Sequence, residues 1–337
     1  MCSERNKDAK RPRRATAQTV ADLAGVSRSA VSRAFTPGAY VDSEKRRRIL
    51  KIAADTGYQP NALAAGLKAG QSNLVAVFVG NMRSPYDSAF VGELAQALSG
   101  LKKWPILIDR TGANTDQALR ELLRYPLDAL ILRGGSMSEE IVDRCARFGI
   151  PMISSGRPVQ GPRVDNVCCR NADGMTMITD LLISRGRRRF GFLSGPEEFY
   201  SSSRRRSGVL QALDRAGLDL VAEHPTDYSV DSGYGAARSL LSRASLDALV
   251  CANDATAIGA LSAARDLSLN VPGDLAIVGF DDIAMAKWPT FRLTTVRNPI
   301  DAAVDAIIAL LERRLVDPGR PEESIFLDPS VIERETH

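Results

Sequence analysis

The sequence predicts a small all-α head at the N-terminus followed by a larger α/β body. Within residues 16–56, apolar residues recur at helical spacing, whereas from residue 73 onward short apolar runs alternate with helical stretches. The charge divides in the same place. Residues 1–70 hold 14 Lys and Arg against 6 Asp and Glu, a net charge of +8, and the other residues carry −4. A basic head on a mildly acidic body indicates a polyanionic partner for the head alone.

The head begins with two short helices that a glycine separates. The first follows Thr16 and ends at Gly25, and Ser27 is expected to cap a second helix that ends near Phe35. The first helix has an apolar stripe made of Ala17, Val20, Ala21, Leu23 and Ala24. Two helices joined in this way predict a helix-turn-helix unit, whose second helix enters the major groove of DNA. The residues expected to contact DNA are Thr16, Ser27, Arg28, Ser29, Ser32 and Arg33.

A third amphipathic helix is expected from Asp42 or Ser43, with the basic residues 45–48 positioned for phosphate contact. The helix-turn-helix domain is predicted to span residues 15–60. Residues 1–14 are expected to form a disordered basic tail, for which ordinary solvation is a sufficient explanation.

The body is predicted to be two doubly wound halves, each a parallel sheet covered by helices, because its apolar runs are too many for one sheet. Strands are expected at 73–79, 105–109, 128–132, 151–154, 189–194, 247–252 and 275–280. Helices are expected near 87–100, 115–124, 138–148, 171–185, 203–216, 232–243, 254–267 and 299–315. In such sheets ligands lie beyond the carboxyl ends of the strands, where this chain has polar, aromatic and cationic residues.

Several stretches resemble the LacI/GalR family of bacterial repressors. They are "TVADLAGVSRSAVSRAF", "VDSEKRRRILKIAADTGYQPNALAAGLKAG", "CANDATAIGAL", "VPGDLAIVGFDDIAMA" and "LTTVRNPI". The resemblance implies a type I periplasmic-binding-protein fold for residues 73–330, with an N-subdomain near 73–168 and 299–328 and a C-subdomain near 169–298 and 329–337. It also implies a homodimer that binds a palindromic double-stranded DNA operator under the control of a small-molecule effector.

The stretch "YQPNALAAGLKAG" has the composition of a helix too short to be stable alone in water. By the resemblance, residues 61–72 are a hinge helix and linker that order on DNA. Asn61 and Ala64 are expected to contact the minor groove, and Leu67 to insert between base pairs at its centre.

The resemblance also implies effector contacts. Carried over position by position, they are Tyr86, Arg205, Tyr228, Asn253 and Asp281, with Tyr228 as a stacking aromatic and the last two as partners of ligand hydroxyls. Two departures add Arg133, where a small polar residue is common, and Arg157, which follows Gly156 rather than an acid. Guanidinium groups favour carboxylate and phosphate, so an anionic sugar derivative is one prediction. Internal pairing of these arginines with Asp165, Asp281 or carbonyls is the alternative.

The chain lacks the signatures of other classes. The N-terminus has no apolar segment like that of a secretory signal, and no apolar run reaches about 20 residues, so a cytoplasmic, nucleoid-associated protein is expected. The five cysteines and two histidines have no metal-ligand spacing, and no nucleophile motif is present, so no metal, cofactor or enzymatic activity is expected. A solute receptor remains the alternative for the body. The absence of a C-terminal leucine heptad argues against a coiled-coil tetramer, although a tetramer is not excluded.

Overall fold

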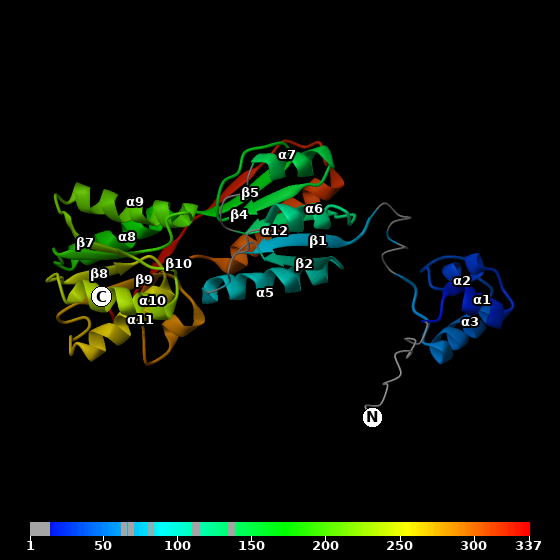
Figure 1. Cartoon of the computed structure of the whole chain (residues 1–337), viewed down its shortest axis with the longest axis horizontal. Helices are drawn as coiled ribbons and strands as arrows, with labels where there is room; N and C mark the ends of the chain where they lie inside the picture. Colours follow the sequence, from blue (N-terminus) through cyan, green and yellow to red (C-terminus); the bar gives the residue numbers. More distant parts are fainter. Residues whose placement is uncertain are drawn as a thin grey trace, which may run out of the picture. The chain divides into compact units, whose positions relative to one another are not determined.

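The computed structural model describes residues 14–61, 66, 71–79, 82, 84–109, 115–133 and 139–337. The chain divides into two compact units, Met1–Ser72 and Asn73–His337. They are the head and the body, drawn in blue and in cyan to red in Figure 1.

The head consists of three helices whose ends are capped as the sequence predicts. They are α1 (Ala17–Ala24), α2 (Arg28–Ala34) and α3 (Ser43–Thr56). The Thr16 hydroxyl accepts a hydrogen bond from the Thr19 backbone in a capping box, and the Ser27 and Asp42 side chains cap the other two helices. Gly25 ends α1 with φ of 62°, a left-handed conformation that glycine adopts without strain.

Val20, Val31 and Ile49 are fully buried and join the three helices of the head into one core. Leu23, which the sequence places in the same apolar stripe of the first helix as Val20 and Ala24, is 61% exposed and does not join this core. Arg46 was expected to be free for phosphate. Its guanidinium instead donates to the carbonyls of Ala34 and Ala39 at 3.0 and 2.7 Å, and so holds the C-terminal end of α2.

The body contains two six-stranded sheets. The first has the order β11-β5-β4-β3-β1-β2, and every pairing within it is parallel. Its strands are β1 (Leu74–Val79), β2 (Trp104–Asp109), β3 (Ala129–Arg133), β4 (Met152–Ser155), β5 (Val164–Cys169) and β11 (Ser324–Leu327). Its helices are α5 (Pro85–Gly100), α6 (Thr115–Leu122), α7 (Glu139–Arg147) and α12 (Ile300–Val316). Figure 1 shows α12, from the end of the chain, lying with these early elements, and it packs on α5. Together they form the N-subdomain.

The second sheet has the order β12-β10-β9-β8-β6-β7, and only the β10–β12 pairing is antiparallel. Its strands are β6 (Phe190–Ser194), β7 (Leu220–Pro225), β8 (Ala248–Cys251), β9 (Ala276–Asp281), β10 (Thr294–Arg297) and β12 (Ser330–Ile332). The helices are α8 (Asn171–Ser184), α9 (Tyr200–Arg215), α10 (Val230–Leu241), α11 (Asp254–Asp266) and the short η1 (Ala284–Lys287). Together they form the C-subdomain, and the two subdomains give the predicted fold class.

The chain crosses between the two sheets three times. The crossings follow β5, β10 and β11, at residues 169–171, 298–299 and 328–329. Five strands escaped prediction: β5, β7, β10, β11 and β12. No helix within the described ranges has the length and apolar character needed to cross a bilayer.

Candidate functional site

The head has a concave surface centred on the second helix of the helix-turn-helix unit. It is bordered by Thr16, Arg28, Ser29, Ser32, Arg33 and Asn61, among other residues of the head. The exposed Arg28 side chain makes no hydrogen bond or ion pair with any described residue, and Arg33 makes one hydrogen bond, from Nε to the Ser29 carbonyl at 3.3 Å. Both guanidinium groups therefore keep donors for bases or phosphates.

Ser27 does not border this surface, because its hydroxyl caps α2 and shares a 2.8 Å hydrogen bond with the Ser29 hydroxyl. Ala64 and Leu67, the expected minor-groove contacts of the hinge, lie outside the described residues.

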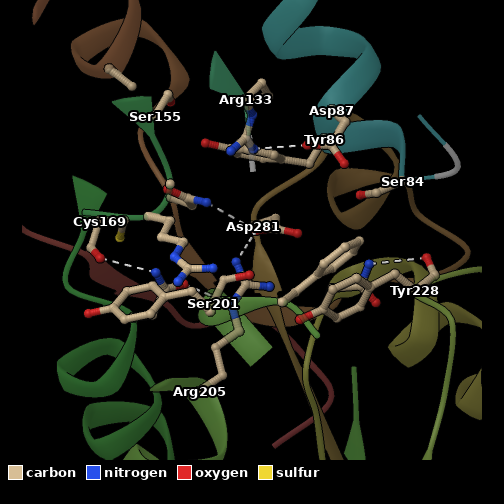
Figure 2. A pocket seen from close by; sticks show the side chains of 18 of the residues that line it. Ser84, Tyr86, Asp87, Arg133, Ser155, Cys169, Ser201, Arg205, Tyr228 and Asp281 are labelled. Carbon is tan, nitrogen blue, oxygen red and sulfur yellow. Dashed lines mark hydrogen bonds and ion pairs between the residues drawn. The ribbon is translucent and has the colours of Figure 1, made fainter. Parts of the chain in front are cut away.

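The body contains a cavity of about 100 Å³ between its two subdomains, and Figure 2 shows it from close by. All seven residues expected at the effector site line it: Tyr86, Arg133, Arg157, Arg205, Tyr228, Asn253 and Asp281. Two of the three crossings contribute to its wall, through Cys169 and Asn171 and through Asn298, and Leu327, the last residue of β11, lies just before the third. The cavity therefore touches the segments that determine the angle between the subdomains.

Arg205 and Asp281 form a buried ion pair on the C-subdomain wall. Arg205 Nη2 lies 2.9 Å from Asp281 Oδ1, and the two side chains are 6% and 4% exposed. The same guanidinium donates to Asn171 Oδ1 at 2.9 Å and to the Ala252 carbonyl at 2.6 Å, while its plane lies 3.9 Å from the centre of the Phe280 ring. It is thus fixed by α8, by the residue that follows β8 and by β9 before any ligand arrives.

Asp281 is also held by Asn298, whose Nδ2 donates to the same Oδ1 at 3.2 Å. Burial raises the pKa of Asp281, and the neighbouring Arg205 opposes that shift. Its other carboxylate oxygen, Oδ2, makes no hydrogen bond with a described residue and can accept a ligand hydroxyl.

Asn253 has less freedom than its predicted role requires. Its Oδ1 accepts from the Thr256 backbone at 2.9 Å to cap α11, and its Nδ2 donates to the Tyr228 carbonyl at 3.2 Å. One N–H of the amide is left to meet a ligand.

Tyr228 lies on the same wall in an unusual conformation. Its φ is 68°, and its ring lies directly over Gly195, where a Cβ would fall 2.1 Å from the ring. The ring stacks on Phe199 at 6.1 Å between centroids, and its buried hydroxyl has no partner within hydrogen-bonding geometry among the described residues. Burial raises the pKa of this hydroxyl, so it stays protonated and can donate to a ligand.

The N-subdomain wall is built around Arg133, at the end of β3. Its Nη2 lies 2.9 Å from Asp87 Oδ1, and its guanidinium lies over the rings of Tyr86 and Phe90 at 5.3 and 4.5 Å. Its Nε is buried and has no acceptor among the described residues. Figure 2 shows Arg133, Tyr86, Asp87 and Ser84 on one side of the cavity, opposite Tyr228 and Arg205.

Arg157 differs from the other two cavity arginines, because its side chain forms no ion pair or hydrogen bond with a described residue. Its backbone is fixed, since the Ser154 hydroxyl donates to its carbonyl at 2.6 Å. Among the residues that the structure describes, internal pairing thus holds for Arg205, with the expected Asp281, and for Arg133, with Asp87 rather than Asp165 or Asp281, and not for Arg157.

The sequence did not single out several polar residues of the cavity. These are Asp87, Ser155, Asn171 and Asn298, whereas Ser84 and Ser201 lie in stretches just past predicted strands, where the sequence predicts ligand contacts. Asn171 and Asn298 lie at crossings, whose positions depend on strands that were not predicted. Asp87 directly follows Tyr86 and could have been found as a helix neighbour on the same turn.

Two family models match the chain. Residues 16–61 match the model of bacterial regulatory proteins of the lacI family, and residues 179–337 match the periplasmic binding protein-like domain.

Similar proteins cover almost the whole chain. The HTH-type transcriptional regulator CelR of Thermobifida fusca is 28% identical, covering 97% of this chain and 99% of that protein. The ribose operon repressor of Escherichia coli K12 is 28% identical, covering 95% and 99%. A solved complex of CelR with cellobiose has a TM-score of 0.72 at 27% identity, covering 96% and 100%. A lac repressor dimer bound to operator and the anti-inducer ONPF has a TM-score of 0.86 at 24% identity, covering 96% and 99%, and shows the fold.

A helix-turn-helix head joined to a binding-protein-like body defines a DNA-binding transcriptional regulator rather than an enzyme. The chain carries the DNA-binding domain of the lacI family of bacterial regulatory proteins joined to a periplasmic binding protein-like domain, as its relatives among the transcriptional repressors indicate.

Proposed function

We propose that this protein is a repressor that binds a palindromic operator as a homodimer and is controlled by a sugar or sugar-derived effector in the cavity of the body. The observation that carries this proposal is the convergence of residues from both subdomains, and from two of the three crossings between them, on one cavity. A ligand held there contacts the segments that change when the subdomains rotate, and such rotation alters the spacing of two DNA-binding heads.

A dimer is expected because one head offers few base contacts, and two linked heads gain affinity through their effective concentration. The relatives support a sugar-derived ligand: one is named for ribose, and a solved structure of another contains cellobiose. The proposed roles are phosphate or base contact for Arg28 and Arg33, and hydrogen bonding to the effector for Tyr228, Asn253 and Asp281.

A solute receptor is the second candidate, since a binding-protein-like body serves that role equally well. The basic concave surface of the head has no use in a receptor, and it favours the regulator.

Fluorescence anisotropy with DNA from upstream of its own gene tests the proposal. We expect saturable binding of two chains to one palindrome, loss of affinity when either half-site is scrambled, and a change in affinity on adding one member of a sugar panel. Equal binding to scrambled DNA, or a stoichiometry of one chain per site, would refute the proposal that a homodimer binds a palindromic operator.

A further inference from the structure

We propose that the effector carries a single carboxylate, which binds between Arg157 and Arg133 on the N-subdomain wall while its hydroxyl-bearing end faces Asp281 and Tyr228. This proposal rests on the proposed function, because it names the chemical class and the orientation of the ligand in that same cavity.

The charges of the cavity do not balance. Five charged side chains line it among the described residues: Asp87, Arg133, Arg157, Arg205 and Asp281. Arg205 pairs with Asp281 and Arg133 pairs with Asp87, so the guanidinium of Arg157 is left over. A partly buried cation without a counter-ion among the described residues favours an anionic ligand, since that ligand supplies the missing charge.

The excess charge is confined to one wall. The C-subdomain wall holds one arginine and one aspartate in a closed pair, and it is neutral as a unit. The N-subdomain wall holds Asp87 and two arginines, so a ligand anion is attracted to that side. The polar groups left on the opposite wall are the Asp281 Oδ2 and the buried Tyr228 hydroxyl, which suit hydroxyl groups rather than a second anion.

Strand register places the two arginines at the ends of neighbouring strands. In the parallel β3–β4 pair Arg133 is the partner of Ser155, and Arg157 follows Ser155 by two residues. The intervening Gly156 has φ of 92° and donates its N–H to the Val167 carbonyl at 3.0 Å, so the chain turns tightly at the end of β4. Gly156 itself carries no acid, and the Nε–H of Arg133 has no acceptor among the described residues that a ligand oxygen would displace.

The charge of the ligand narrows its chemical class further. A carboxylate carries one negative charge and matches the excess, whereas a phosphate monoester carries about −1.5 to −2 and would leave unbalanced charge in a confined site. A monosaccharide acid combines one carboxylate with the hydroxyl groups that suit the opposite wall. The expected ligand is therefore a sugar acid, such as an aldonate or a uronate.

Calorimetry on the full-length protein with matched probes tests this inference. The panel pairs glucuronate with glucose, galacturonate with galactose and gluconate with glucitol, and adds glucose 6-phosphate and inorganic phosphate. We expect at least one acid to bind at least tenfold more tightly than its neutral parent and than either phosphate. Arg157→Gln should weaken that acid at least tenfold and change binding of the neutral parent less than twofold.

Arg204→Gln is the matched control, because Arg204 is exposed on α9, outside the cavity, and should leave all affinities unchanged. Unchanged thermal unfolding and operator affinity in Arg157→Gln exclude misfolding. Equal or tighter binding of neutral sugars, preference for a phosphate, or no binding of any acid at millimolar concentration would overturn the carboxylate proposal. Operator release by a neutral sugar would overturn it as well, and would leave the proposed repressor function intact.

Discussion

Replacing Asp281 by Asn is expected to destabilise the body by about 3 kcal/mol. Breaking a buried ion pair costs about 3–5 kcal/mol, because the remaining charge stays buried without its partner. Here the remaining charge is Arg205, 6% exposed, which keeps the neutral oxygens of Asn171, Ala252 and the new amide as acceptors but loses the carboxylate charge that balances it. The lower end of the range applies because the substitution also removes the desolvation cost of the carboxylate, the main cause of its raised pKa.

Urea unfolding at pH 7, followed by circular dichroism, measures this change. Asp87→Asn is the control, since Asp87 is one-third exposed and its pair with Arg133 is partly solvated, so a loss of about 1 kcal/mol or less is expected. A double-mutant cycle with Arg205→Met should give a coupling energy of about 2 kcal/mol or more. Additive effects within about 0.5 kcal/mol would refute the view that the two groups act as one unit.

Three further expectations follow from other parts of the chain. Burial, with a contribution from Asp281, raises the pKa of Asp254 from 3.8 to about 7, so the folded state binds this proton more tightly than the unfolded state does. The free energy of unfolding should therefore fall as pH rises from about 4 to 7. In chemical denaturation, Asp254→Asn should flatten this dependence of stability on pH. Leu67→Ala should weaken operator binding at least tenfold and leave effector binding intact. Equal operator affinity of the variant and the wild-type protein in fluorescence anisotropy would contradict the insertion of Leu67 between base pairs. Arg28→Ala should weaken operator binding and reduce its salt dependence without lowering the melting temperature, whereas Arg46→Ala should lower the melting temperature through loss of its bonds at the end of α2.

The strands that the sequence predicts are the ones buried on both faces. β1, β3 and β9 are almost continuously apolar and buried, which is the pattern of a central parallel strand. β7 escaped prediction because it is an edge strand that alternates half-buried and exposed residues and carries Glu223 and His224. β5 carries the buried Asp165, whose charge interrupts the apolar pattern. Its carboxylate is bound by Arg314 and Arg320 from the far end of the chain, at 2.8 and 2.7 Å.

In the cavity, too, the residues that could be predicted are those that a local sequence pattern identifies. Arg205 and Asp281 could be found from the resemblance, because each lies at a fixed distance from a recognisable motif. Asn298 and Asn171 could not be assigned from local pattern, since their roles depend on where the chain leaves one sheet for the other. The ion-pair partners of the cavity arginines could not be predicted either, because Asp87 and Arg133 come into contact only when β3 and α5 pack together.

The position of Asn298 links ligand recognition to subdomain movement. It lies between β10 of the C-subdomain and α12 of the N-subdomain, and it donates to the Asp281 carboxylate that we expect to bind the effector. A ligand that hydrogen-bonds to Asp281 therefore affects the crossing that contains Asn298 as well as the C-subdomain wall. A ligand anion bound to Arg157 contacts the other subdomain. A ligand that contacts both walls binds more tightly to the conformation that holds the two subdomains at one particular angle. Only this difference in affinity can shift the population of the protein towards that conformation. A sugar lacking the carboxylate would engage the C-subdomain wall alone, so it should bind weakly and change operator affinity little even at saturation, by the reciprocity of linkage.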